Sequence, residues 1–298
     1  MAFLSLLLVA AAVPAPPHSA LATAQRPIQE IIGKSGAEVS VAARTFDGEE
    51  LLIEPDTSFH AASTMKIPVM IELFQQAKEG TLSLDETLLV TNSFASIVDQ
   101  SPYALDPGSD SDPEVYTSLG SRLSLGRLCE SMIAMSSNLA TNLLMVRLGL
   151  PHIQSRVHAL GADGMNVIRP LEDTKAFLKG LNNTTTARAL LILLSALASG
   201  RAVDTASDAT MVAILKRQHF SDAIPAGLPP GIPVAHKTGE ITKIQHDAAI
   251  VYAPRPFVLV VLVRGIEDRT KSTALIAEIA HAVYAATQDA PVSTGLAP

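Results

Sequence analysis

The order of two hydrophobic periodicities along the chain constrains its fold more than any other feature. Apolar and β-branched runs typical of strands occur at both ends of the chain, at residues 38–45, 51–53, 234–239, 248–252 and 257–263. From residue 63 to about residue 198 the apolar residues recur mostly at helical spacing. The two ends can therefore share one sheet only if the helical middle is inserted between them.

The predicted fold class is α+β, with one antiparallel sheet from both chain ends, flanked by helices, and an inserted all-helical subdomain. Residues 25–290 are predicted to form a single domain. Its α/β subdomain comprises 25–62 and 212–290, its helical subdomain comprises 63–211, and 291–298 is a disordered tail. Hydrophobic residues make up 48% of the 298 positions, which is ample for a large core.

Turn and cap residues refine this prediction. Asp47-Gly48 is expected to close a hairpin between the first two strands, and Gly33 to end a short helix beginning at Pro27. Helices are expected at 126–148, 186–198, 208–218 and 270–287. Asp, Pro, Gly and Ser fill residues 106–113, which predicts an exposed loop.

The first 24 residues are predicted to be an export signal. Residues 3–13 form an apolar run too short to span a bilayer, and Ala22-Thr23-Ala24 offers a cleavage pattern before Gln25. The expected location is therefore periplasmic or extracellular. No Lys or Arg precedes the run, so an ordinary buried segment is the alternative reading.

Composition narrows the possible partners. Net charge is −7 and only 17% of residues are charged, so neither nucleic acid nor an anionic membrane is an expected partner. No later run is long enough for a membrane span, and Cys129 is the single cysteine, so no stable membrane anchor and no disulfide are expected. We expect a monomer, and small molecules or polymers with some positive or mixed charge remain open as partners.

Ser63 and Lys66 are the first candidate catalytic residues. They lie three positions apart before the apolar run 67–74, so both side chains fall on one face of a helix that starts there. A lysine buried in a core can lose its proton near neutral pH and activate a serine as nucleophile. A helix-capping serine with a surface lysine is the alternative for an isolated Ser-x-x-Lys pattern.

Two further segments carry polar residues where the surroundings are apolar. Ser136-Ser137-Asn138 interrupts the predicted helix 126–148, so these residues either cap or kink that helix or line a cleft. Lys237-Thr238-Gly239 ends a predicted strand, where Lys237 needs a polar partner unless the strand is an exposed edge, and Gly239 permits close approach.

These three motifs in this order resemble the penicillin-interacting serine hydrolases, and among them the class A β-lactamase-like group. The likeness extends from the Asp47-Gly48 hairpin to the final helix. It implies that Ser63 attacks an amide carbonyl, that Lys66 takes its proton, and that Ser136 passes a proton to the leaving nitrogen.

The resemblance also implies roles for the residues around the nucleophile. Lys237 supplies positive charge near Ser136 and, with Thr238, binds a substrate carboxylate. Asn138 binds the amide of the substrate side chain. Gly239 and Glu240 belong to the same substrate-binding strand, and the backbone N–H groups of Ser63 and Glu240 hold the oxyanion.

The chain departs from the group's pattern at the step that follows acylation. The glutamate motif that activates hydrolytic water is absent, and Glu172 is the nearest candidate, with surface pairing to Arg169 or Lys175 as the alternative. Ser137 stands where these enzymes usually carry aspartate. Lys243 or His246 replaces the usual arginine as a carboxylate ligand. The 106–113 insertion lengthens one wall of the cleft.

The predicted activity is that of a secreted serine β-lactamase acting without a cofactor or metal, with antibiotic resistance through β-lactam catabolism as the implied role. The alternatives are a D-alanyl-D-alanine carboxypeptidase or esterase of the penicillin-binding kind, and a non-turnover module that binds β-lactams or peptidoglycan. No glycine-rich phosphate loop, G-x-S-x-G pattern or H-x-x-x-H pair supports another enzyme class.

Overall fold

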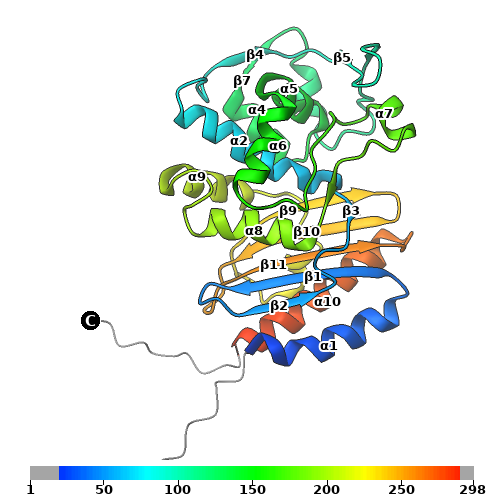
Figure 1. The fold of residues 1–298 in the computed structure, drawn as a ribbon, viewed down its shortest axis with the longest axis vertical. Helices are drawn as coiled ribbons and strands as arrows, with labels where there is room; N and C mark the ends of the chain where they lie inside the picture. Colours follow the sequence, from blue (N-terminus) through cyan, green and yellow to red (C-terminus); the bar gives the residue numbers. More distant parts are fainter. Residues whose placement is uncertain (1–19, 289–298) are drawn as a thin grey trace, which may run out of the picture.

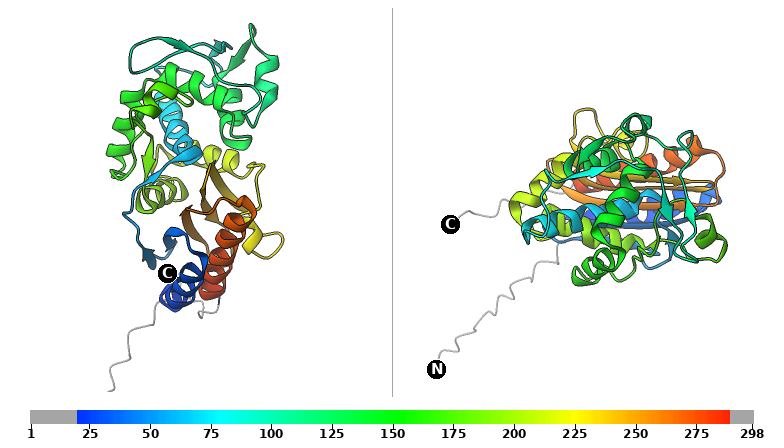
Figure 2. Two further views of the ribbon diagram at one scale, coloured as in Figure 1. Left: turned by 90° about the vertical axis from the view of Figure 1, so that its right-hand side faces the viewer. Right: turned by 90° about the horizontal axis from the view of Figure 1, so that it is seen from above.

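The computed structural model describes residues 20–288, so the predicted signal (except residues 20–24) and the predicted tail 291–298 lie outside the described residues. The described chain has two parts (Figures 1 and 2). A five-stranded sheet covered by helices forms one, and a group of helices with small two-stranded sheets forms the other. No helix among the described residues is long and apolar enough to cross a membrane.

The sheet joins both chain ends, as the order of periodicities predicts. Its strands are ordered β2-β1-β11-β10-β9, and every neighbouring pair is antiparallel. Their bounds are β1 Glu38–Thr45, β2 Glu50–Ile53, β9 Val234–Ile241, β10 Ile244–Val251 and β11 Phe257–Arg264. β11 is central and buried along almost its whole length, which explains its nearly continuous apolar sequence.

Helices cover both faces of this sheet (Figure 1). α1 (Ala20–Ser35) and α10 (Arg269–Gln288) pack side by side on one face, with η2 (Ile224–Gly227) against α10. α8 (Ala187–Ala198) lies on the other face, and α9 (Thr205–Leu215) packs beside it. The sheet is therefore the middle layer of three.

The second part surrounds α2 (Lys66–Lys78). Its larger helices are α4 (Leu125–Ala134), α5 (Asn138–Leu148) and α6 (Leu150–Ala159), and short helices are η1 (Ala62–Met65), α3 (Pro113–Thr117) and α7 (Thr174–Leu178). Short strands pair as β3 (Phe59–His60) with β8 (Thr184–Thr185), β4 (Thr87–Leu89) with β7 (Arg122–Ser124), and β5 (Phe94–Ala95) with β6 (Pro102–Tyr103). η1 and α2 lead directly from the sheet layer into this part.

The first helix begins at Ala20 and not at Pro27, which corrects the sequence prediction. Leu21 and Ile28 are fully buried on one face of α1. Burying each contributes roughly 2 kcal/mol, and together this exceeds the roughly 3 kcal/mol that an internal proline costs. Gly33 lies inside the helix, and Gly36, with φ 68°, follows its end.

The predicted helix at 126–148 is two helices. Ser136 has φ 62°, a left-handed conformation through which a helix does not continue. Ser137 then caps α5 by accepting a hydrogen bond from the backbone N–H of Ala140. The polar triplet therefore breaks the helix, as the capping alternative requires.

The 106–113 loop is only partly exposed, because two of its aspartates are buried. Asp110 and Asp112 are 8% and 2% exposed. Asp112 caps α3 through the N–H of Glu114, and Asp110 accepts from backbone N–H groups at the start of α5. The Asp-rich composition reflects helix capping as well as exposure.

Candidate active site

Ser63 lies in η1, where that short helix meets the edge strand β9. A Cβ atom at residue 239 would lie 3.2 Å from the Ser63 backbone nitrogen and 3.1 Å from Thr64 Cγ2. Glycine at this position therefore lets η1 lie close against β9, as the sequence predicts. The Ser63 side chain remains partly exposed at this junction.

Lys66 is the first residue of α2 and is fully buried. Its Nζ donates to Ser136 O at 2.6 Å, to Asn138 Oδ1 at 2.9 Å and to Ser136 Oγ at 3.1 Å. Burial lowers the pKa of Lys66 well below its usual value, and the nearby Lys237 lowers it further. The first and second motifs therefore meet around a buried amine, and the surface-lysine alternative is wrong.

Lys237 is also fully buried, although β9 is an edge strand. Its Nζ donates to the carbonyl oxygen of Thr238 at 2.9 Å. Burial lowers the pKa of Lys237 to about 7, against the opposing effect of the Asp247 carboxylate. The exposed-edge alternative for this lysine is therefore wrong.

Glu172 is joined to the same group of residues. Its Oε1 accepts from Asn138 Nδ2 at 2.9 Å, and its Oε2 accepts from the backbone N–H of Asp106 at 3.3 Å. Asn142 holds the preceding residue by two hydrogen bonds to the Leu171 main chain. Glu172 itself has φ 61°, so the loop is held in a conformation that costs energy for a non-glycine residue.

The surface-pairing alternative for Glu172 is wrong. Lys175 pairs with Asp99 at 2.6 Å. The Arg169 guanidinium donates to the carbonyl oxygens of Leu181 and Pro170. Glu172 therefore pairs with neither cation, and its carboxylate accepts a hydrogen bond from the Asn138 side-chain amide.

His246 does not line the cleft, which corrects its place among the substrate ligands. The side chain is fully buried, and its Nε2 contacts His60 O at 2.9 Å. Burial lowers the pKa of His246 to about 4, so the ring is neutral at pH 7 and is no partner for a carboxylate. A period-2 strand pattern identifies which residues share a face but not which face meets the site.

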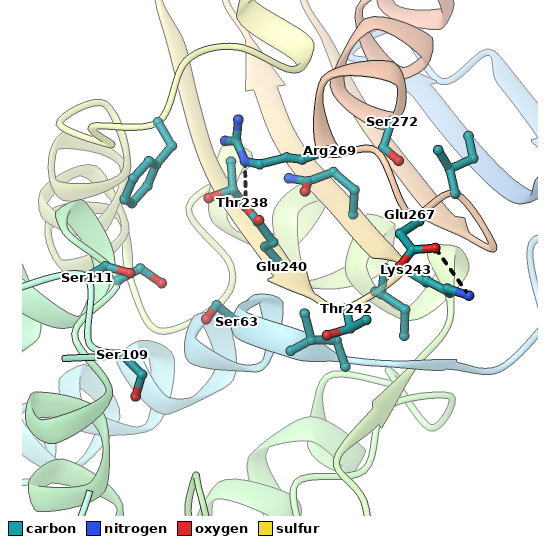
Figure 3. Close-up of a pocket in the computed structure, with 16 residues that line it drawn as sticks. Ser63, Ser109, Ser111, Thr238, Glu240, Thr242, Lys243, Glu267, Arg269 and Ser272 are labelled. Carbon is teal, nitrogen blue, oxygen red and sulfur yellow. Dashed lines mark hydrogen bonds and ion pairs between the residues drawn. The ribbon is translucent and has the colours of Figure 1, made fainter. Parts of the chain in front are cut away.

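Two cavities open on either side of Ser63. The first, of about 510 Å³, is lined mostly by polar and charged groups, among them Ser136. Figure 3 shows Thr238 and Lys243 in this lining. The second, of about 410 Å³, holds Asn138 and Glu172 together with apolar side chains. Those apolar residues are Ala62, Leu171, Phe177 and Ile241. Ser63 and Glu240 line both cavities.

Charged residues of the first cavity are paired with one another. Arg269, the first residue of α10, contacts Glu240 at 2.8 Å and Asp222 at 2.5 Å. Lys243 contacts Glu267 at 3.7 Å. Sequence reasoning found Lys243 but missed Arg269, because nothing in the residue's local sequence connects the start of the last helix with the third motif.

Ser109 and Ser111 face the first cavity from the 106–113 loop, across from Ser63 (Figure 3). The insertion therefore forms part of the cleft wall, as predicted. Asp110, between them, points instead to α5. Among residues 20–288, no group of three or more His, Cys, Asp or Glu residues could hold a metal ion.

Together these residues form a cleft around Ser63 with both polar and apolar walls. The partly exposed Ser63 lines both cavities, Lys66 follows it at the start of α2, and Lys237 lies on β9, the strand against which η1 packs. Such a set can perform nucleophilic acyl transfer. It brings a serine hydroxyl and a buried amine into one region, and these are residue types that such a reaction uses.

Known proteins share this arrangement of the chain. The model of the beta-lactamase enzyme family matches residues 23–287. A beta-lactamase of Bacillus licheniformis is 28% identical over 239 residues, covering 78% of this chain and 73% of its own.

Two solved structures extend the comparison. An acyl-enzyme complex of a PBP-A mutant with penicillin G is 26% identical, covering 93% of this chain and 100% of its own, with a TM-score of 0.77. An ancestral class A beta-lactamase is 25% identical, covering 88% and 99%, also with a TM-score of 0.77. The likeness thus spans the sheet and the helical part together.

Proposed function

The chain belongs to the beta-lactamase enzyme family, and we propose that it is a serine β-lactamase that hydrolyses the lactam amide through an acyl-enzyme on Ser63. The observation that carries the proposal is Lys66, a fully buried amine in the turn after Ser63 whose three hydrogen bonds go to residues of the second motif.

Acylation begins with proton transfer from Ser63 to Lys66, directly or through a water. A neutral amine has two N–H donors and one lone pair, so it can donate to Ser136 O and Asn138 Oδ1 and still accept a proton. The Ser63 Oγ–carbon bond forms as the lactam carbon–nitrogen bond breaks. Lys66 then returns the proton to the leaving nitrogen through the Ser136 hydroxyl, 3.1 Å away.

Substrate is oriented by the two cavities. Lys237 and Thr238 bind the carboxylate at the polar side, and Asn138 binds the amide of the acyl substituent. The oxyanion lies between the backbone N–H groups of Ser63 and Glu240. Apolar side chains in the second cavity, Phe177 and Ile241, are 52% and 40% exposed and favour an apolar acyl substituent there.

Deacylation uses water activated by Glu172. The water oxygen bonds to the acyl carbon, its proton passes to Glu172, and the ester bond to Ser63 Oγ breaks with return of a proton to that oxygen. Support comes from the shared cavity of Ser63 and Glu172, and from the hydrogen bond between Glu172 and Asn138.

One observation favours a second candidate, a D-alanyl-D-alanine peptidase or esterase that deacylates β-lactams slowly. Both carboxylate oxygens of Glu172 already accept hydrogen bonds, so a hydrolytic water would have to share them with the Asn138 amide and the Asp106 N–H. The similar PBP-A mutant structure is an acyl-enzyme complex with penicillin G. If the acyl-enzyme did not deacylate at all, the protein would act as a non-turnover binding module.

Intact-mass spectrometry with benzylpenicillin, combined with turnover of a chromogenic cephalosporin, separates these candidates. A transient adduct with continuous turnover supports the β-lactamase, a lasting adduct supports the peptidase or binding module, and no adduct contradicts all three. Turnover of a D-alanyl-D-alanine peptide then divides the peptidase from the module. Ser63→Ala should abolish the adduct, whereas Ser121→Ala, at an exposed serine outside both cavities, should not.

Glu172→Gln tests the deacylation step separately. An amide cannot take the water proton, so the adduct should persist while its formation rate changes little. Unchanged adduct lifetime would show that another group activates the water.

Export and a monomeric state complete the proposal. Cleavage before Gln25 would remove Leu21 and Ala24, which are 0% and 3% exposed in α1. The loss of the Leu21 packing would cost roughly 2 kcal/mol, so cleavage at a bond upstream of Leu21 would leave the more stable exported chain. N-terminal sequencing of the secreted protein and its mass in solution test both points.

A further inference from the structure

Asp110 occupies a buried position between the 106–113 loop and α5. Its Oδ2 accepts from the backbone N–H groups of Asn138 at 3.0 Å and Leu139 at 2.9 Å, and Ser137 Oγ lies 3.4 Å away. Its Oδ1 accepts from the N–H of Asp112 at 3.0 Å. One carboxylate thus ties the loop to the start of α5.

This contact reaches the residues that hold Lys66. Asn138 and Ser136 supply the oxygen atoms bonded to Lys66 Nζ, and the Asn138 N–H is bonded to Asp110. Ser136 keeps a left-handed φ of 62°, which needs support from its surroundings. A carboxylate at the first N–H groups of α5 provides it, because those donors have no partner inside the helix and attract negative charge.

We propose that Asp110 is a positioning residue for acylation, whose carboxylate holds the Ser136–Asn138 turn so that its oxygen atoms receive Lys66. The proposal rests on the acylating role of Ser63 and Lys66 proposed above. The proposal also gives the 106–113 insertion a function. The middle residue of the second motif is Ser137 and carries no carboxylate, and Asp110 of the insertion supplies one beside it.

Charged groups near Lys66 also change its pKa, in addition to the hydrogen bonds that fix its position. The groups facing Lys66 are Lys237 from β9, Asp110 from the loop before α3, and Glu172 from the loop before α7. Both carboxylates raise the pKa of Lys66, Asp110 more than Glu172, against the larger lowering by burial and Lys237. Tyr116 from α3 faces Asp110, and its own pKa is raised by burial and by that carboxylate.

Asp110→Asn removes the charge and leaves one oxygen where two accept hydrogen bonds. Acylation of Ser63 by benzylpenicillin, measured by rapid-quench mass spectrometry, should fall about tenfold to 100-fold, because the base is misplaced. Removing the negative charge lowers the pKa of Lys66, so the acidic limb of the pH profile for acylation should move to lower pH. A purely structural role would lower the rate without moving that limb.

Glu114→Gln is the matched control. It removes one carboxylate from the adjoining segment at an exposed position whose side chain contacts Arg127 at 3.7 Å. This variant should keep the wild-type rate and pH profile. Equal behaviour of the two variants, or an unmoved limb in Asp110→Asn, would overturn the proposal.

A second measurement is independent of any reaction with penicillin. The Lys66 side chain, labelled with ¹³C at Cε and assigned with Lys66→Arg, is titrated by NMR in the whole protein. Its midpoint should be lower in Asp110→Asn than in Glu114→Gln or the unaltered chain. An unmoved midpoint would overturn the role of Asp110 even if acylation proceeds. A shifted midpoint without any adduct would reject the acylating role of Ser63 and Lys66 and leave only the effect of Asp110 on the Lys66 amine.

Discussion

Two buried lysines lie on elements that adjoin η1, one in each part of the molecule, and they differ in how their charge is accommodated. Lys66, at the start of α2, donates to three oxygen atoms of Ser136 and Asn138, whereas Lys237, on β9, donates to the adjacent carbonyl of Thr238. Both are fully buried, and burial lowers the pKa of each.

This contrast shows how the same residue type can serve two purposes. Oxygen atoms of Ser136 and Asn138 hold the Lys66 amine, and burial lowers its pKa, which shifts it toward the form that can accept a proton. Lys237 adjoins Thr238, which lines the polar cavity, and its pKa is about 7. We therefore expect Lys66 to govern the rate of acylation and Lys237 to govern affinity for an anionic substrate.

Replacing Lys66 should have the largest effect. Lys66→Met removes the base but preserves much of the buried volume, and the acylation rate should fall about 10²- to 10⁴-fold. Stopped-flow or quench measurement of adduct formation gives this rate. Lys78→Met, at an exposed lysine of the same helix, should change it little. A Lys66→Met protein that acylates as fast as its control would assign the base elsewhere.

Lys237→Met should have an intermediate effect, expressed in KM. Losing a charged hydrogen bond to the substrate carboxylate weakens binding by about 1.5–3 kcal/mol, which is roughly 10- to 100-fold. Steady-state kinetics separates KM from kcat, and Lys271→Met on the exposed side of α10 is the control. A loss confined to kcat would mean that Lys237 acts on the chemical step and that the two lysines do not differ as proposed.

The dependence of kcat/KM on pH should be the smallest of these effects, and its direction follows directly from the charge of Lys237. Lys237 is cationic below its pKa of about 7, so kcat/KM for an anionic substrate should decline as pH rises above 7. Each further unit of pH lowers the cationic fraction by at most about tenfold. Lys237→Arg keeps its charge and should move this limb to higher pH. An alkaline limb identical in Lys237→Arg would assign it to another group.

Much of the site could be predicted from short patterns. Ser63 and Lys66 share one helical turn, and the apolar residues after them indicated that both are turned toward a core. The three motifs then occurred in an order typical of one group of hydrolases. Each of these signals is local, so no knowledge of long-range contacts was needed to find them.

His246, Arg269 and Asp110 show where such reasoning stops. His246 alternates correctly with its strand neighbours, yet its ring is directed into the core against His60. Arg269 reaches the cavity from a helix that starts far from the third motif, and it pairs there with Glu240. In the sequence, Asp110 is one of several polar residues of a predicted loop. Its role becomes visible only in the structure, where its carboxylate accepts a hydrogen bond from the start of α5.

Local patterns were enough to specify the α+β order of elements, the hairpin at Asp47-Gly48 and the candidate nucleophile with its two lysines. Periodicity and turn chemistry act over a few residues, and the sequence displays them directly. The oxygen atoms that hold Lys66, the direction of Glu172 and the burial of Asp110 emerged only when distant segments packed together. Those contacts join residues 28 to 72 positions apart, and packing of the sheet against the helical part sets their distances.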